Sequence, residues 1–427
     1  MRVLIISHNV ISETNNMGKT LLSYFRDFKP DEVAEFYIQD KDPKNAVVAN
    51  SFYRVTDREA LKSIFGKKVG TEFHLDSSKP ETASVHTGTY ESIRQYGRKR
   101  NSFVYTIRNT VWSLSHWRTK KLMSWLTHFN PDVIFFMAGD YSFMFKITAA
   151  IQEYLNKPLV ICCVDDFFLY NRNENSVLGR HQHKTYMKNV RRVMEKASCI
   201  LTISDAMGEE YHKLFNKPCF TLHTSVKKRI TDESRTKNKI AYFGNLSFRR
   251  YEQLTEIGKA IKKLGLHDVN GIDVYSGEKN PENLIGLTEE NGVVFHGEIT
   301  PAEVAKKMDE CMVIIHTESF SPRTQKMIQY SVSTKIADSL LNGPCLIAYG
   351  PEKLASIDYL KKNKAAYVIT RPEDLEIGLH EILTNSELRS EIVRNARKLG
   401  AENHDEAVNP KKVREWLRRT IDGQLSV

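Results

Sequence analysis

The chain has 427 residues, of which 41% are hydrophobic and 27% are charged, and its formal net charge is +10. This length exceeds what one ordinary hydrophobic core accommodates, so we expect two domains of about 200 residues each. A basic balance favours anionic partners such as nucleotide phosphates, a membrane surface or nucleic acid. No nucleic-acid-binding module is recognisable among the basic stretches, which disfavours the last of these.

The six cysteines include no Cys-x-x-Cys pair and mostly lie in apolar runs. This usage predicts buried thiols in a reducing compartment, with neither a disulfide framework nor a zinc site. The apolar start at residues 3–6 is too short for a signal peptide or a membrane span, and no other stretch reaches spanning length. We therefore expect a cytoplasmic protein.

A polar loop with one glycine, residues 8–20, separates an expected buried strand at 2–7 from a helix that opens at 21–25. Such a loop is typical of a ligand-binding turn at the carboxyl edge of a parallel sheet. Gly18-Lys19-Thr20 resembles the end of a phosphate loop, but Glu13 replaces the glycine which that motif needs, so a P-loop NTPase is disfavoured. Asn16 and Gly18 would let the backbone approach a substrate in a cleft between the domains, with a structural turn as the alternative.

Residues 105–129 are basic and rich in tryptophan, with Trp112, Trp117 and Trp125 interleaved among arginines and lysines. A helix of this kind can lie in a membrane interface. The alternative is a helix whose apolar side packs on a sheet and whose basic side is solvated. Residues 40–100 before it are polar and irregular, and we assign them no role.

The rest of the first half alternates apolar runs at 131–137, 158–164, 199–203 and 220–222 with helical patterns at 143–155 and 184–196. This alternation predicts a parallel α/β sheet covered on both faces. Three strands are followed by a dipeptide that contains aspartate: Gly139-Asp140, Asp165-Asp166 and Ser204-Asp205. Since ligands bind at the carboxyl ends of such strands, these dipeptides are candidates for a ligand site, with helix capping as the alternative.

A charged segment poor in apolar residues, 223–238, reads as a linker, and the α/β pattern then restarts. We expect strands at 239–243, 271–275, 293–296 and 312–317, with helices at 251–264 and 301–311. The second half is therefore a second α/β domain of similar size.

The chain is organised around residues 331–351. Ile336, Leu340 and Leu341 recur on one helical face, and Gly343-Pro344 predicts the helix end, with the glycine in the left-handed conformation. Residues 345–349 then form a buried strand. Lys335 and Asp338 share a face near the helix N-terminus, where a phosphate would be held and Asp338 could bind ribose or sugar hydroxyls. A solvated Lys–Asp pair is the alternative.

Several motifs of the second half occur in the order seen in GT-B glycosyltransferases: Gly244-Asn245-Leu246 with Arg249-Arg250, then Val294-Phe295-His296-Gly297, His316-Thr317-Glu318 and the stretch from Ser333 to Pro344. The chain resembles the family-four type of bacterial transferases that build surface polysaccharides and glycoconjugates. The likeness is strong over about 197–350 and weaker in the first half. It implies two Rossmann-like, doubly wound parallel-sheet domains facing a cleft: an acceptor-side domain at 1–222 and a nucleotide-sugar-binding domain at 239–404, with residues 405–427 packing back on the first.

The resemblance also implies a donor site. The loop after the first strand of the second domain contains Gly244 and Asn245. In it, Arg250 with Arg249 beside it would bind the donor diphosphate. Thr334 and Lys335 match the family's Ser-Lys pair, and Asp338 would hold the ribose. Tyr330 stands where the family has a sugar-contacting glutamate. Glu318 is the candidate to replace that glutamate, and we group it with Asp165 and Asp166 as catalytic. The resemblance implies that the acceptor enters near the loop at Asn16, Met17 and Gly18. Asp165 or Asp166 could then orient or deprotonate its hydroxyl, with a solvated helix cap as the alternative. The resemblance implies retention at the anomeric carbon and no metal or other cofactor.

These observations predict a glycosyltransferase that uses a nucleoside-diphosphate sugar and acts on a glycan, a lipid-linked or a protein acceptor, peripherally at the inner face of the membrane, with no nucleic-acid partner. Two alternatives remain open. One is a non-catalytic GT-B-like subunit of an active transferase, suggested by the missing glutamate; the other is a sugar-nucleotide epimerase.

Overall fold

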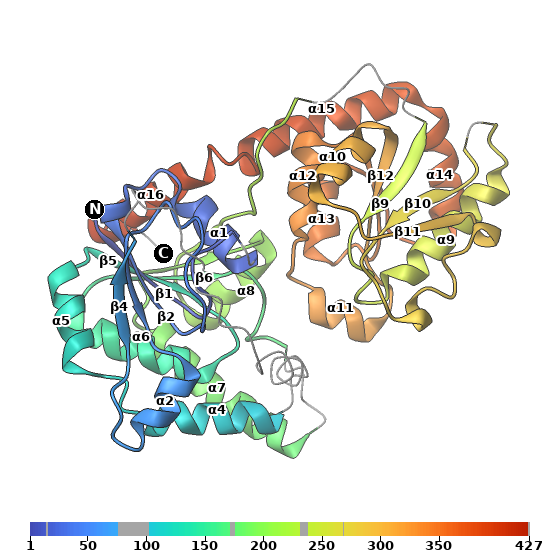
Figure 1. Ribbon diagram of the computed structural model, residues 1–427. Helices are drawn as coiled ribbons and strands as arrows, with labels where there is room; N and C mark the ends of the chain where they lie inside the picture. Colours follow the sequence, from blue (N-terminus) through green and yellow to red (C-terminus); the bar gives the residue numbers. More distant parts are fainter. Residues whose placement is uncertain (14–15, 76–101, 171–175, 231–237, 268, 426–427) are drawn as a thin grey trace. The chain divides into compact units, whose positions relative to one another are not determined.

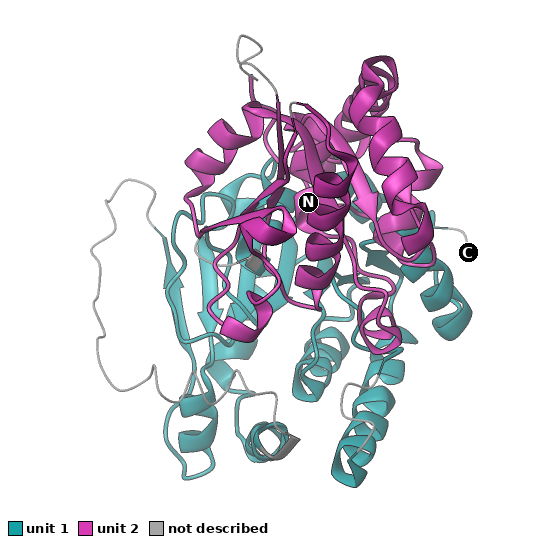
Figure 2. Cartoon of the chain, turned by 90° about the vertical axis from the view of Figure 1, so that its right-hand side faces the viewer, with its two compact units in different colours: residues 1–221, 410–427 teal, residues 222–409 magenta. Residues whose placement is uncertain are grey.

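The computed structural model describes residues 1–13, 16–75, 102–170, 176–230, 238–267 and 269–425. The chain divides into two compact units (Figure 2): residues 1–221 with 410–427 form unit 1, and residues 222–409 form unit 2. Each unit is a parallel sheet with helices packed around it (Figure 1), which confirms the α/β class predicted from the alternating pattern.

Unit 1 contains an eight-stranded sheet in the order β4-β3-β2-β1-β5-β6-β7-β8. Every pair of neighbours is parallel except β3 and β4. The central strands are buried along their whole length, as expected of a parallel sheet covered on both faces. The strands are β1 Val3–Ser7, β2 Val33–Tyr37, β3 Ser51–Arg54, β4 Thr71–His74, β5 Val133–Met137, β6 Leu159–Cys163, β7 Cys199–Thr202 and β8 Cys219–Thr221.

The helices of unit 1 include one formed by the end of the chain. In α16 the indole of Trp416 stacks on Phe220 at 5.5 Å, and Arg414 donates to Glu32 at 3.0 Å, so this helix packs in unit 1. The helices are α1 Asn16–Phe25, η1 Pro30–Glu32, α2 Asp57–Ser63, α4 Ser102–Leu114, α5 Lys120–Phe129, α6 Ser142–Leu155, α7 Val177–Met194, α8 Asp205–Phe215 and α16 Asn409–Ile421.

Sequence analysis assigned no role to residues 40–100, and the structure describes residues 40–75 of this range. This part contains β3, α2 and β4. These elements are short and half polar, and β4 lies at the sheet edge with partly exposed side chains, so their local pattern is weak. They are specified instead by pairing with β2 and by packing on α4.

The tryptophan-rich stretch forms two helices, α4 and α5, where the pattern suggested one. Trp112, Trp117 and Trp125 are only 2%, 8% and 4% exposed. Trp112 stacks on Phe143 at 4.8 Å, and the indole of Trp125 donates to Ser51. The core-facing alternative is therefore the one found for these side chains. No helix in the described part of the chain has both the length and the apolarity needed to cross a bilayer.

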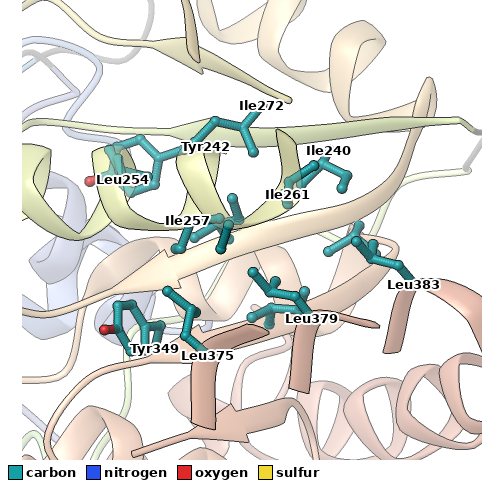
Figure 3. Close-up of a cluster of buried hydrophobic side chains, with 14 of the residues drawn as sticks. Ile240, Tyr242, Leu254, Ile257, Ile261, Ile272, Tyr349, Leu375, Leu379 and Leu383 are labelled. Carbon is teal, nitrogen blue, oxygen red and sulfur yellow. The ribbon is translucent and has the colours of Figure 1, made fainter. Parts of the chain in front are cut away.

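Unit 2 contains a six-stranded, wholly parallel sheet in the order β11-β10-β9-β12-β13-β14. Figure 3 shows part of its core, in which side chains of α9 and α14 meet those of the sheet. The strands are β9 Lys239–Phe243, β10 Ile272–Tyr275, β11 Val293–Gly297, β12 Cys311–Thr317, β13 Cys345–Tyr349 and β14 Tyr367–Ile369. The helices are α9 Arg250–Leu264, η2 Pro281–Asn283, η3 Glu289–Asn291, α10 Pro301–Asp309, α11 Pro322–Ile328, α12 Thr334–Asn342, α13 Ala355–Lys362, η4 Pro372–Asp374, α14 Leu375–Thr384 and α15 Ser386–Asn403.

Gly343 ends α12 as predicted, but in a different conformation. Its φ is −83° and its ψ is 169°, so the backbone is extended and not left-handed. Glycine is needed there because a Cβ would lie 2.6 Å from the carbonyl oxygen of Ser339 and 2.8 Å from Ile314. The constraint is close packing.

Gly18 is also constrained by packing. Helix α1 begins at Asn16, five residues before the predicted start, so Gly18 lies in its first turn. A Cβ on Gly18 would lie 2.5 Å from the carbonyl oxygen of Ser12 and 2.7 Å from that of Val10. The first turn of α1 therefore rests directly on the backbone that follows β1.

We expect Gly18→Ala to destabilise unit 1 by about 1–3 kcal/mol, because backbone oxygens cannot move aside for the added methyl group. Gly139→Ala is the matched control, since no atom lies within 4 Å of the Cβ that it would add. Chemical denaturation monitored by fluorescence measures both. Equal stability of the two variants would show that the contact at Gly18 can relax.

Candidate functional site

A pocket of 260 Å³ opens in unit 2 at the carboxyl ends of β9, β10 and β12. β9 lies between β10 and β12, so the order of connections reverses beside it, and open α/β sheets bind ligands at such a point. The pocket is also lined by the first turns of α12 and by the segment after β11. Its charged lining residues are Arg250, Glu298, Lys335 and Asp338.

Lys335 is the cation that this pocket leaves uncompensated. Its ammonium group lies against Gly244, where a Cβ would come within 2.5 Å of Nζ. Within the described part of the chain, Nζ has no hydrogen-bond or ion-pair partner. Burial, followed by the nearby charge of Arg250, lowers the pKa of Lys335 to about 8, although Glu318 acts in the opposite direction.

Arg250, in contrast, is paired with a buried carboxylate. The guanidinium Nη2 donates to both carboxylate oxygens of Glu318, at 2.9 and 2.8 Å, and Nε donates to Oε2 at 3.0 Å. Nε also donates to the carbonyl of Thr317, and Nη1 donates to Asn245. The two side chains are 11% and 4% exposed. Bidentate geometry of this kind makes a strong, orienting ion pair.

The loop between β9 and α9 is strained. Phe248 and Arg249 have φ values of 64° and 62°, a left-handed conformation that non-glycine residues rarely adopt. Each such residue costs of order 1–3 kcal/mol and persists only where its surroundings fix it. The hydrogen bonds of Arg250 to Asn245 and of Tyr242 to the carbonyl of Asn245 supply that fixation. With this backbone conformation the side chain of Arg250 lies in the pocket wall, and the side chain of Arg249 is exposed to solvent.

His316 lies on β12 beside the ion pair and lines the pocket. Its Nε2 is buried without a hydrogen-bond partner in the described structure, and lies 3.5 Å from Glu318. Burial lowers the pKa of His316 to about 4, although the Glu318 carboxylate raises it and the charges of Arg250 and Lys335 lower it further. The imidazole is therefore neutral at pH 7, and Glu318 has Arg250 as its charged partner.

Asp338 lies one turn into α12, half-buried in the pocket wall. Its Oδ1 accepts a hydrogen bond from Asn342 at 2.8 Å. The same Asn342 amide also bonds the carbonyl of Lys227 and the amide of Arg229. Asp338 is thus held in place by a residue that anchors α12 to the segment at 227–229.

An aromatic stack lies along the β10 side of the pocket. Phe243 and Tyr275 stack with ring centroids 5.1 Å apart, and Tyr275 stacks on His296 at 4.6 Å. His296 in turn contacts Asp273 at 2.7 Å. Phe243 and Tyr275 line the pocket, which therefore has an apolar wall opposite its charged one. Sequence analysis did not identify this wall, although the three rings come from neighbouring parallel strands.

The structure brings together some of the predicted donor-site residues and separates others. Gly244, Arg250, Lys335 and Asp338 line the pocket. Glu318 and Asn245 lie behind it as partners of Arg250. Arg249 is exposed and paired with Glu252 at 2.5 Å, and Thr334 is exposed at the start of α12. The expected pair of adjacent arginines facing one ligand is therefore not formed.

The predicted acceptor-side residues all belong to unit 1. Asp166 is buried and accepts hydrogen bonds from the amides of Phe168 and Leu169 and from the hydroxyl of Tyr211, which is the geometry of a structural cap. Asp165 is half-buried, and its carboxylate accepts from the amide of Asp166 at 3.0 Å. Asn16, Met17 and Gly18 form the first turn of α1.

A polar cluster that sequence analysis missed lies at the carboxyl ends of β1 and β5. His8 stacks on Tyr141 at 4.6 Å, and its Nε2 lies 3.0 Å from Arg108. Arg108 also lies over the Tyr141 ring and pairs with Asp57 at 2.9 Å. Burial, and then the charge of Arg108, lower the pKa of His8 to about 4, so Nε2 accepts the hydrogen bond of the guanidinium. The sequence showed Arg108 only as part of a basic stripe.

Known proteins resemble this chain in structure and not in sequence. No protein-family model and no curated protein sequence matches the chain. Solved structures match it over nearly its whole length. HepE from Anabaena in complex with UDP is 12% identical, with a TM-score of 0.63, and the match covers 98% of this chain and 100% of that one.

Two further structures show the same likeness. WaaG, a glycosyltransferase involved in lipopolysaccharide biosynthesis, is 12% identical, with a TM-score of 0.53 over 96% of this chain and 98% of that one. The α,α-trehalose 6-phosphate synthase from Burkholderia multivorans is 11% identical, with a TM-score of 0.59 over 99% and 97%. With the two Rossmann-like sheets, these likenesses confirm the predicted GT-B fold.

Lys335 predicts a specific pH dependence of stability. Its pKa is about 8 in the folded chain, below its ordinary value of 10.5, so the unfolded state binds the proton more tightly. The cost of the buried charge is fully present below pH 8 and disappears as pH rises toward 10.5. We expect Lys335→Met to stabilise unit 2 by about 1–3 kcal/mol at pH 7 and by progressively less above pH 8.

Urea denaturation of both proteins at several pH values measures this difference. Lys306→Met, at an exposed position on α10, is the control and should show no such trend. A stability difference that does not change between pH 7 and 10 would mean that Lys335 has an ordinary pKa.

Proposed function

We propose that the chain is a glycosyltransferase that moves a sugar from a nucleoside-diphosphate sugar to an acceptor. The observation that carries this proposal is the ammonium of Lys335, which has no partner among the described residues and is seated against Gly244 in a pocket at the first turn of a helix. A diphosphate supplies the negative charge that this ammonium lacks, and helix N-terminal amides favour the same anion. The UDP found in the HepE structure, which has the same fold, supports a nucleotide in this pocket.

The donor would be oriented by the residues that line the pocket. Lys335 and Arg250 would contact the diphosphate, and Asp338 would accept hydrogen bonds from ribose hydroxyls. The apolar wall at Phe243 and Tyr275 offers the less polar part of the ligand a surface. Because HepE was also solved with UDP-glucose, we propose a UDP-sugar as donor.

Transfer requires that a nucleoside diphosphate leave the anomeric carbon. Negative charge then develops on the departing phosphate oxygen, and Lys335, Arg250 and the first turn of α12 would stabilise it where it forms. Groups that act on the transition state more than on the ground state accelerate the step. The reaction would proceed with retention, as the family resemblance implies.

The acceptor would be a glycan, a lipid-linked sugar or a protein, in surface polysaccharide or glycoconjugate synthesis at the inner face of the membrane. The role of WaaG in lipopolysaccharide biosynthesis supports that setting. We propose that the acceptor binds unit 1 near the first turn of α1 and Asp165. Of the two aspartates, Asp165 is the better candidate base, because Asp166 already accepts three hydrogen bonds.

A second function is favoured by one observation. The sugar-contacting glutamate of the family is replaced by Tyr330, and Glu318, its candidate substitute, is bound to Arg250. A chain with a donor pocket but no sugar-contacting carboxylate could act as a non-catalytic subunit. Release of free nucleotide from the sugar conjugate, with and without acceptor extracts, distinguishes the two functions, because only a transferase turns the donor over.

Binding of UDP should raise the melting temperature, because a ligand that binds only the native state stabilises it by about 4 kcal/mol at a thousandfold excess over Kd. GDP, CDP and ADP serve as comparisons in the same thermal-shift screen. Lys335→Met should lose most of the UDP shift. Arg250→Ala is a poorer test, because it leaves Glu318 buried and unpaired and so weakens the fold itself.

Arg249→Ala is the matched control for this screen, since it removes a cation next to Arg250 that faces away from the pocket. It should retain the UDP shift. If no nucleotide shifts the melting temperature, or if Arg249→Ala abolishes the shift while Lys335→Met does not, the donor site is misplaced.

Affinity for UDP should fall as pH rises through about 8, because only the protonated Lys335 attracts the diphosphate. At pH 9 about a tenth of the free protein would carry that proton, so we expect roughly tenfold weaker binding than at pH 7. Isothermal titration calorimetry measures the affinity, and in Lys335→Met it should be flat over this range. An equally steep decline in the variant would assign the titration to another group.

A further inference from the structure

The end of α2 forms an exposed apolar tip in unit 1. Leu61 and Phe65 are four residues apart and are 47% and 77% exposed. We call residues 58–68 the α2 tip. Ala60 and Ser63, on the opposite side of the same turns, are buried, so the tip is anchored to the body of the unit.

The phenylalanine lies in an ordered turn. Gly66 has a φ of 75°, and its amide bonds the carbonyl of Ser63 at 3.0 Å. The amide of Lys67 bonds the carbonyl of Lys62 at 3.3 Å. This pair of bonds around a left-handed glycine closes a helix end. Phe65 is therefore held at the surface by regular hydrogen bonding.

The polar surroundings of these two side chains are cationic. Four exposed basic residues lie in the α2 tip: Arg58, Lys62, Lys67 and Lys68. Glu59, the acidic residue of the tip, and Asp57 just before it are both engaged by other groups. Asp57 accepts from Arg108 and from the Trp112 indole, and Glu59 bonds Thr56 and the amide of Gly70. The outward charge of the tip is thus positive.

The neighbouring helix α4 extends the apolar surface. The amide of His116 bonds the hydroxyl of Ser63 at 2.9 Å, and the His116 ring contacts the carbonyl of Ser63. Leu114, two residues before His116, is 59% exposed. Figure 1 shows α2 and α4 beside one another in unit 1. Leu114 is thus an exposed apolar residue at the end of the helix that packs beside α2.

We propose that the α2 tip docks on the surface of an anionic lipid bilayer. Phe65 and Leu61 would enter the interface, while Arg58, Lys62, Lys67 and Lys68 would contact lipid phosphates. Exposed apolar side chains among cations fit the boundary between lipid headgroups and acyl chains. There, anionic phosphates and an apolar layer lie within a few ångströms of each other. A nucleic acid would use the cations but gives no reason for an exposed leucine and phenylalanine.

This proposal extends the peripheral membrane location proposed above and moves the contact away from the tryptophans, which are buried. Membrane binding needs neither donor nor acceptor. A negative result here would therefore leave the transferase proposal standing, and failure of the nucleotide screen would leave the docking surface standing.

Flotation of the full-length protein with lipid vesicles tests the proposal. Vesicles of phosphatidylcholine alone are compared with vesicles containing about one third phosphatidylglycerol. We expect binding to the anionic vesicles only, weakening as salt is raised. Leu61→Ser with Phe65→Ser should lower the partition coefficient about tenfold or more. Lys62→Glu with Lys67→Glu should lower it at least as much, since each lysine near an anionic surface contributes roughly a fivefold factor.

Matched controls lie in unit 2. Ile377 on α14 is 74% exposed, like Phe65, but has Glu373, Asp374 and Glu376 close to it in the sequence. Ile377→Ser and Lys306→Glu should leave flotation unchanged. All of these positions are exposed, so the melting temperatures of the variants should match that of the parent. Flotation of the Leu61→Ser, Phe65→Ser protein at the parental level overturns the proposal, as does a loss confined to the charge variant.

Phe65→Cys, labelled with an environment-sensitive fluorophore, gives a second readout. Its emission should shift to the blue when anionic vesicles are added and stay unchanged with phosphatidylcholine vesicles. Emission that is already blue-shifted without lipid, and does not change on addition of vesicles, would mean that another part of the protein covers position 65. That result overturns the proposal.

Discussion

The buried ion pair between Arg250 and Glu318 is the interaction on which the pocket of unit 2 depends. Both charges are withdrawn from water, and removing one partner of such a pair commonly costs about 3–5 kcal/mol because the other is left uncompensated. Arg250 is the first residue of α9 and Glu318 follows β12, so the pair fixes the strained β9–α9 loop to the end of the sheet. It also neutralises Arg250, which leaves Lys335 as the charge that defines the pocket.

The carboxyl edge of unit 1 is built from similar groups with a different electrostatic result. There Arg108 is paired with Asp57, lies over Tyr141 and donates to a neutral His8. Its charge is compensated by Asp57 of α2. In unit 2 the carboxylate of Glu318 pairs with Arg250, and no carboxylate among the described residues pairs with Lys335. An edge with balanced charge suits an uncharged hydroxyl partner, whereas an edge with an excess cation suits a phosphate, and this contrast is consistent with the acceptor and donor roles proposed for the two units.

Elements with a strong local signal could be predicted from the sequence, and those defined by tertiary contacts could not. The apolar runs of β9 and β13 and the periodic pattern of α12 determine those elements locally. The short half-polar β3 and β4 depend on pairing with their neighbours. The tryptophan stripe had two possible environments, because an amphipathic pattern does not say what covers its apolar side. Arg249 and Arg250 could not be told apart, since two left-handed residues decide which of them turns inward.

The lowered pKa of Lys335 links stability to binding in unit 2. No group in the described part of the chain pairs with this half-buried ammonium, so its charge destabilises the folded state near neutral pH. A neutral side chain at that position would make the unit more stable, and a subunit that bound no anion would have no physical use for the lysine. A diphosphate would relieve the unfavourable charge as well as form new contacts, so part of its binding energy would come from strain already present in the pocket. The unpaired cation therefore weighs against a purely structural role for this pocket, even though Glu318 is occupied by Arg250.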